Sequence, residues 1–268
     1  MMLIVLTVIF VLLALFTGGD RTAKSIVTLF LSAGVMMLTI VAIYLGVPPL
    51  AGGLFCVAVV AVITTLFQNE CNQKSMTALL AVFLTTAVLL LLIFVFVDRG
   101  HLAGMADTGQ VYVRESNGFE GNIGIDMRMV EVAVLLITLV GAVIDAAIAV
   151  VAGTYEVAAA RPALGRQALF RSGMRIGGNI LSSTVNTLFF IFAGEYLLLF
   201  VNFMTYYSFA AMINSKEFAQ GAISIAVSAF GCVLVIPVAA ALAAVRLTGG
   251  SNRQYGNEKT DDGGERSE

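Results

Sequence analysis

Apolar segments of close to 20 residues recur along most of this chain and restrict the folds that it can adopt. About 20 apolar residues in an α-helix cross the roughly 30 Å hydrocarbon core of a bilayer, and the helix satisfies its own backbone groups there. Strands of a membrane β-barrel would instead alternate apolar and polar residues. Only 12% of the residues are charged, whereas soluble domains carry about 25%. The predicted fold class is all-α, a polytopic helical membrane protein.

The hydropathy pattern predicts about seven transmembrane helices and one further apolar segment. The further segment, residues 195–213, is interrupted by Asn202 and by a Thr-Tyr-Tyr-Ser cluster. It is a short eighth span, a re-entrant segment or a helix buried among the others. The first run has no basic residues before it and no small-residue cleavage site after it, so we interpret it as an uncleaved span. The seven expected spans are 2–17, 25–46, 50–67, 75–97, 130–153, 176–193 and 219–245.

The charges of the loops predict an orientation in the cell membrane. Residues 154–175 hold four arginines and one acid, whereas residues 98–129 hold five acids and three arginines. Cytoplasmic loops carry an excess of Lys and Arg, so we expect 154–175 to be cytoplasmic and 98–129 extracytoplasmic. The side of the C-terminus depends on whether 195–213 crosses. The expected division is four N-terminal spans (1–97), the extracytoplasmic loop (98–129), a C-terminal transmembrane bundle (130–247) and a disordered polar tail (248–268).

Asp145 is the residue of this sequence that most suggests a function. It lies in the middle of the apolar run 130–153, where a carboxylate costs at least about 2.5–3.5 kcal/mol and usually faces a bundle interior or a polar cavity. Gly141, Ala149 and Gly153 are spaced around it by four, close to one helix face. Such small residues let another helix approach closely. We therefore expect a neighbouring helix to satisfy the carboxyl group.

The next expected span, 176–193, carries a polar stripe that suits this role. Asn179, Ser183 and Asn186 fall at i, i+4 and i+7, with Ser182 beside them. Uncharged hydrogen-bonding side chains within a span need partners away from lipid. The simplest packing places the stripe against Asp145, and Gly177 with its neighbouring glycine loosens the start of the helix. The alternative interpretation is that Asn and Ser only hold helices together.

No sequence pattern predicts catalysis, a cofactor or a metal site. The chain lacks a Walker A loop and a His-Glu-x-x-His zinc motif, the patterns that would indicate ATP hydrolysis and a zinc protease. It has one histidine and three cysteines without a CxxC pair, which argues against structural zinc. The formal net charge of −2 gives no indication of nucleic-acid binding. We therefore expect a protein that is not an enzyme, with the lipid bilayer as its first partner.

Several short motifs together resemble a known family. They are Ile125-Asp-Met-Arg128, Gly141-Ala-Val-Ile-Asp-Ala146, Ser172-Gly-Met-Arg-Ile-Gly177, Asn186-Thr-Leu188 and Phe192-Ala-Gly194. In combination they resemble the YibE/F-like multitransmembrane family of bacteria, most strongly over 125–245 and only in hydropathy over the first four spans. The chain is similar to the shorter, YibF-like members, which implies a hetero-oligomer with a longer YibE-like membrane protein. The family pattern has Arg-Asp after Ile-Gly, where this chain has Gly178 and Asn179.

Two functions remain open from the sequence. The first is a permease or transporter-like component in which Asp145 responds to protons or cations and Asn179, Ser183 and Asn186 line the same cavity. The second is a non-transporting scaffold or accessory subunit of a YibE-like partner, in which Asp145 only fixes helix packing. The sequence identifies no substrate, and a flux assay on Asp145→Asn separates the two functions.

Overall fold

The fold of the chain comes from a computed structural model, which describes residues 2–68, 71–100, 125–206 and 208–261. These residues form helices and no strands. Six segments are long and apolar enough to cross a membrane, which confirms the predicted class of helical membrane protein. Their bounds are Thr22–Tyr44, Pro49–Phe67, Gln73–Arg99, Met127–Ala160, Arg166–Glu195 and Lys216–Thr248.

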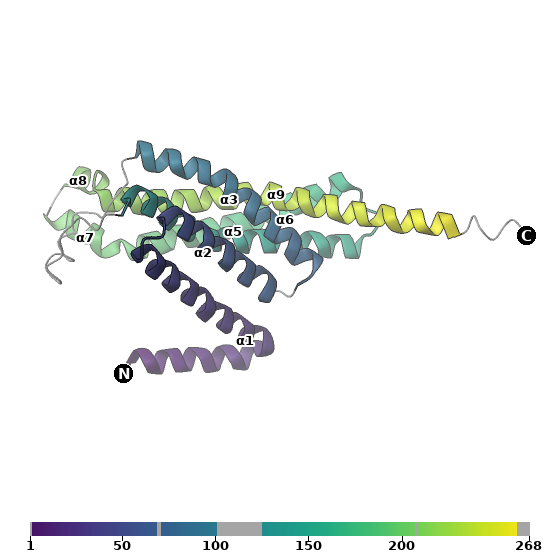
Figure 1. Cartoon of the computed structure of the whole chain (residues 1–268), viewed down its shortest axis with the longest axis horizontal. Helices are drawn as coiled ribbons and strands as arrows, with labels where there is room; N and C mark the ends of the chain where they lie inside the picture. The colour runs from purple at the N-terminus through teal and green to yellow at the C-terminus, as the bar shows by residue number, and fades with distance from the viewer. Residues whose placement is uncertain (1, 69–70, 101–124, 207, 262–268) are drawn as a thin grey trace, which may run out of the picture.

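The part of the first helix that follows its bend runs antiparallel to the second helix (Figure 1). Helix α1 (Met2–Tyr44) is bent at Gly19, whose φ of 54° is a left-handed conformation that favours glycine. Before this bend, α1 runs from Met2 and includes the apolar segment Val5–Phe16. Six segments of the described residues have the length and hydropathy of a membrane span, fewer than the seven expected, and the first span at 2–17 stays a prediction.

The next two helices lead into the core of the bundle. Helix α2 (Pro49–Val62) begins with a proline in its first turn and continues into the π-helical turn η1 (Ile63–Phe67). Helix α3 (Gln73–Arg99) begins at Asn72, whose side chain accepts a hydrogen bond from the backbone N–H of Ser75. This cap satisfies one of the N–H groups left free at a helix start.

Helix α5 (Met127–Ala160) is the central element of the bundle. It packs against α2, α3, α6 (Arg166–Glu195) and α9 (Lys216–Asp261). Its buried residues include Leu136, Leu139 and Val143, which belong to one apolar core shared with α3 and α9. The N-terminal and C-terminal spans thus form a single bundle rather than two separate halves.

The segment between α6 and α9 does not cross the bundle. It forms α7 (Leu197–Tyr206) and α8 (Phe209–Ile213) at the end of the bundle opposite the α5–α6 turn (Figure 1). Helices of these lengths reach about 15 Å or less, half of the hydrocarbon core. Because α9 then runs back along the bundle, its C-terminal end lies at the same end as the turn between α5 and α6. The two short helices argue against a full eighth span at 195–213, and the exposure of Leu197, Leu198 and Val201 argues against a helix buried among the others.

The expected loop 154–175 is shorter in the structure. Helices α5 and α6 extend into it and leave only residues 161–165 as the turn. Helix α9 continues to Asp261 (Figure 1), and the disordered tail at 248–268 stays a prediction. Most of the predicted extracytoplasmic loop lies outside the described residues.

Candidate polar face on α5 and α6

Asp145 lies on the outer side of α5 and not in the core. Its neighbours Ile144 and Ala146 are buried, whereas the side chain of Asp145 is exposed. Thr138 and Gly141 are exposed as well, and a Cβ added to Gly141 would meet no atom within 4 Å. At about 100° per residue, these three positions lie within about 60° of one another around the helix. Together with Val134 they form one exposed stripe along the middle of a helix whose other sides are largely buried.

The polar stripe on α6 is also exposed. Asn179, Ser182, Ser183 and Asn186 all lie on the accessible side of the helix. None of their side chains hydrogen-bonds to another described side chain. The Thr187 hydroxyl donates to the backbone oxygen of Ser183 at 3.0 Å. The neighbouring Gly178 also faces open space, because a Cβ added to it would meet no atom within 4 Å. The stripe is therefore open along its whole length within one chain.

Both stripes turn away from residues of their own helices that contact α9. On α5, Val143 contacts Gly231 of α9, and on α6, Gly177 contacts Ile236 of α9. Asp145 and Asn179 each lie two residues further on, which is about 200° around the helix. Asp145 and Asn179 therefore lie on other sides of their helices than these two contacts, and the Asp145 carboxylate remains close enough to the Cys232 thiol of α9 to act on it electrostatically.

The two stripes overlap in depth at Asp145. Gly153 of α5 contacts Ile176 of α6, and the two helices are antiparallel. Counting equal steps from this contact places Asp145 level with Thr184, so that Ser183 and Asn186 lie within about 3 Å of its depth. We call this surface the α5–α6 polar face. It comprises Thr138, Gly141, Asp145, Gly178, Asn179, Ser182, Ser183 and Asn186.

The small residues explain why the predicted closed site is an open face. The sequence predicts that Gly153 and its neighbours bring the polar stripe onto Asp145. In the structure Gly153 instead meets the apolar side chain of Ile176, and Gly177 meets Ile236. Ala149 is half-buried, and Gly141 packs against nothing among the described residues. Apolar packing between α5, α6 and α9 therefore turns the polar residues outward.

The interior of the bundle contains polar groups of a different kind. Among the described residues the buried polar side chains are hydroxyls of Thr and Ser, and none is charged. The hydroxyl of buried Thr77 on α3 accepts a hydrogen bond from Arg246 of α9 at 3.1 Å and lies 3.4 Å from the hydroxyl of Tyr155 on α5. This contact joins three helices at one end. Sequence reasoning missed it because the three residues are distant along the chain.

A second polar cluster lies at the opposite end, near α7. The side chain of Gln220 donates to Glu131 at 3.4 Å. Close by, Tyr196 stacks against Phe200 with ring centroids 6.3 Å apart. Burial raises the pKa of the Tyr196 hydroxyl, and the nearby carboxylates of Glu195, Glu217 and Glu131 raise it further. Tyr196 therefore stays a neutral hydrogen-bonding group.

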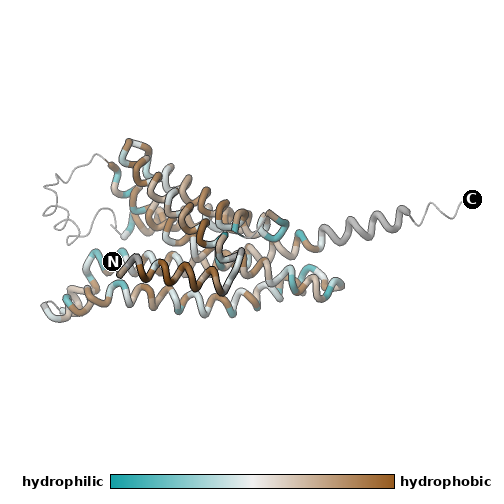
Figure 2. The backbone as a smooth tube through the Cα atoms, turned by 90° about the horizontal axis from the view of Figure 1, so that it is seen from below, coloured by the Kyte–Doolittle hydropathy of each residue, from teal (hydrophilic) through white to brown (hydrophobic). Residues whose placement is uncertain are grey.

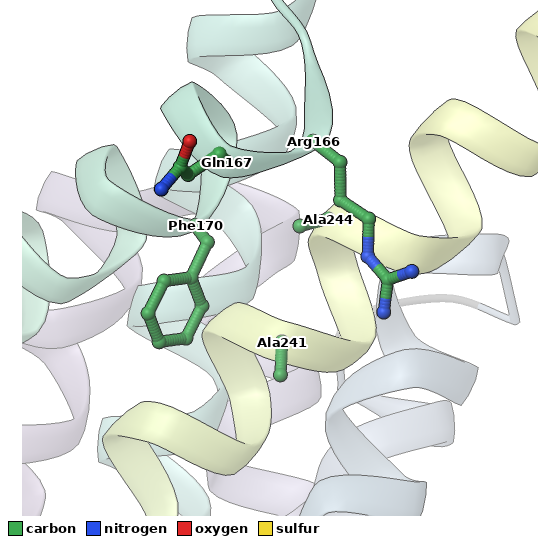
Figure 3. A pocket seen from close by; sticks show the side chains of 5 residues that line it. All are labelled: Arg166, Gln167, Phe170, Ala241 and Ala244. Carbon is green, nitrogen blue, oxygen red and sulfur yellow. The ribbon is translucent and has the colours of Figure 1, made fainter.

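A shallow pocket lies beside the α5–α6 turn, between α6 and α9 (Figure 3). Its volume is about 340 Å³, and Phe170, Ala241 and Ala244 form its apolar lining. Arg166 stands at its side with its guanidinium directed along α9. The arginines counted in the predicted loop 154–175 thus lie at the end of the bundle where Arg246 also lies.

The cysteines provide no ligand cluster in the described part of the chain. Cys56 and Cys232 are buried and free, and Cys71 is exposed and free. Among these residues no three His, Cys, Asp or Glu side chains gather closely enough to hold a metal ion.

Comparison with known proteins identifies one family. A family model described as YibE/F-like protein matches residues 6–249. The match covers the N-terminal helices as well, so the resemblance extends well beyond the region 125–245 in which the sequence motifs are strongest. No curated protein and no solved structure matches the chain.

Proposed function

Because the chain belongs to the YibE/F-like family of helical membrane proteins, we propose that it is a permease-type subunit in which Asp145 responds to protons or cations. The observation that carries this proposal is the placement of Asp145, Ser183 and Asn186 on exposed helix faces and at one depth. A carboxylate beside Asn and Ser oxygens offers ligands to a small cation, and intramembrane acids mark ion and proton pathways by default.

In this function the polar face is one wall of the pathway. Asp145 would take up and release the ion, and Asn179, Ser183 and Asn186 would replace part of its water shell. The buried polar side chains of the described interior are hydroxyls only, which supports a pathway at the outer face of α5 and α6. A second helical surface would close the other wall. The arginine-rich end of the bundle would face the cytoplasm.

The test is a flux measurement on Asp145→Asn. The purified full chain is placed in liposomes that contain a pH-sensitive dye, and proton entry is followed under a proton gradient and under Na⁺ or K⁺ gradients. Wild type is expected to exceed protein-free liposomes, and Asp145→Asn is expected to fall to their rate. Glu156→Gln is the matched control, because Glu156 lies on the same side of α5 but at its exposed end. Equal flux in wild type and Asp145→Asn would remove the acid from the pathway.

A second function is favoured by the openness of the polar face. An accessory subunit that only completes a YibE-like partner would also present unsatisfied polar residues on its outside. Asp145→Asn would then lower co-purification of that partner, and neither wild type nor variant would carry ions. This protein would have no catalytic role in either function.

A further inference from the structure

The α5–α6 polar face is incompatible with direct exposure to lipid. Asp145, Asn179 and Asn186 are exposed on membrane-length helices, and they have no hydrogen-bond partner among the described side chains. Unsatisfied polar groups in hydrocarbon are strongly disfavoured, and a carboxylate at the bilayer centre is among the costliest. The face therefore needs another surface that supplies donors and acceptors at the same depth.

We propose that this surface is the same face of a second copy of the chain, related by a two-fold axis along the membrane normal. Copies inserted in one membrane share an orientation, so such an axis places every residue at the depth of its own counterpart. An interface of this kind is formed by one self-complementary patch. Helix α6 of each copy then runs parallel to α6 of the other.

The spacing on α6 suits a parallel pair of identical helices. Asn179, Ser182 and Asn186 fall at i, i+3 and i+7, the a–d–a spacing that keeps one seam facing a parallel partner. Asn carries both donors and an acceptor, and a Ser hydroxyl does both as well. Each of these residues can therefore bond to its own copy. Gly178 lies next to this seam with open space around it, which lets the backbones approach.

The same pairing also supplies Asp145 with partners. Its stripe on α5 adjoins the open side of α6, so a second α6 that packs along the seam also covers α5. Because the two-fold axis runs along the membrane normal, each residue of the second copy lies at the same depth as in the first. The carboxylate of Asp145 therefore comes level with Ser183 and Asn186 of the second copy, whose O–H and N–H groups can donate to it. The two α6 helices separate the two carboxylates. Each copy thus completes the face of the other.

This inference concerns the face used in the proposed function but does not depend on transport. A different membrane protein would need a polar helix whose side chains match the spacing and the depth of this face. A second copy of the chain matches both the spacing and the depth by symmetry. The dimer is tested by proximity and the permease by flux, so either result can fail without the other.

Disulfide cross-linking in native membranes tests the dimer. In a Cys71→Ser background, which removes the exposed thiol, Ser182→Cys and Asn186→Cys are each oxidised with copper phenanthroline. Both are expected to give a covalent dimer of twice 28.3 kDa. The matched control is Val233→Cys, because Val233 is 46% exposed on α9 and lies near the depth of the seam. The control is expected to stay monomeric.

Three results of the cross-linking experiment would overturn the proposal. They are no dimer at either seam position, equal dimer at Val233→Cys, and a cross-linked species whose mass shows a different protein. Two differently tagged copies provide a second measurement that needs no cysteine. In the double variant that combines Asn179→Leu and Asn186→Leu, their co-purification is expected to fall about 3-fold to 20-fold. This factor corresponds to the free energy of an interhelical hydrogen bond in a membrane. Unchanged co-purification in that variant also contradicts the inference.

Discussion

Helices α1 and α6 are both poorly buried, but the middle of α6 exposes Asn and Ser side chains, whereas the middle of α1 exposes mainly apolar ones. In their most apolar stretches only 11% of α1 and 6% of α6 is buried, whereas the mean hydropathy is 2.5 for α1 and 1.4 for α6. The exposed face of α1 carries residues such as Phe30 and Met37, and its N-terminal part is strongly apolar throughout in Figure 2. The exposed face of α6 carries Asn179, Ser182 and Asn186.

This difference separates a face that contacts lipid from a face that contacts protein. Lipid tails are as apolar as Leu or Phe, so α1 needs no protein partner along its outer side. Polar side chains inside the hydrocarbon face other helices or a water-filled cavity. Low burial alone therefore does not identify an interface in a membrane protein. The chemistry of the exposed side chains does.

The largest expected effect comes from placing an acid on the lipid-facing side of α1. Phe30→Asp puts a carboxylate on an exposed position, and the insertion scale gives a cost of about 3–4 kcal/mol relative to Phe. We expect the variant to reach the membrane at a small fraction of the wild-type level, measured by carbonate extraction and immunoblotting. Phe30→Leu should match wild type. Normal insertion of Phe30→Asp would show that this face of α1 also meets a polar surface, and the contrast with α6 would be lost.

The sequence predicts the membrane helices well because apolar length is a local property. Long uninterrupted runs such as 75–97 correspond closely to helices in the structure. Hydropathy does not predict the bend of α1 at the glycine pair Gly18-Gly19, which falls just after the expected span 2–17. Segment 195–213 is ambiguous from sequence because its hydropathy fits several depths equally well.

The candidate site is predicted only in part, since rotation of a helix is set by its neighbours. The sequence identifies Asp145 and the α6 stripe and places them on adjacent helices. It does not show that Gly177 packs on Ile236, and this contact turns Asn179 outward. The Thr77–Arg246 hydrogen bond has no local pattern at all, because Ser and Thr usually bond within their own helix.

A pair of neighbouring glycines tests which side of α6 packs within the chain. A Cβ at Gly177 would overlap Ile236, whereas a Cβ at Gly178 meets nothing within 4 Å. We expect Gly177→Ala to lower the free energy of unfolding by about 1–3 kcal/mol through overpacking. Gly178→Ala should raise it by up to about 1 kcal/mol, because Ala favours a helix. Unfolding of the detergent-solubilised monomer measures both, and equal effects would mean that α6 is rotated differently.

The smallest expected change in stability is that of a substitution on the polar face, and it is compared with a substitution in the interior of the chain. Asn186→Leu should change the free energy of unfolding of the detergent-solubilised monomer by less than about 0.5 kcal/mol, as is usual for surface substitutions. Its side chain is exposed and has no described side-chain partner. Thr77→Val is the buried comparison, because it removes the acceptor of the Arg246 hydrogen bond, and a hydrogen bond to a charged group contributes about 1.5–3 kcal/mol. If Asn186→Leu destabilises the monomer as much as Thr77→Val, the Asn186 side chain already has hydrogen-bond partners within one chain. In that case α6 would not differ from α1 by an open polar face, and the face would need no second copy.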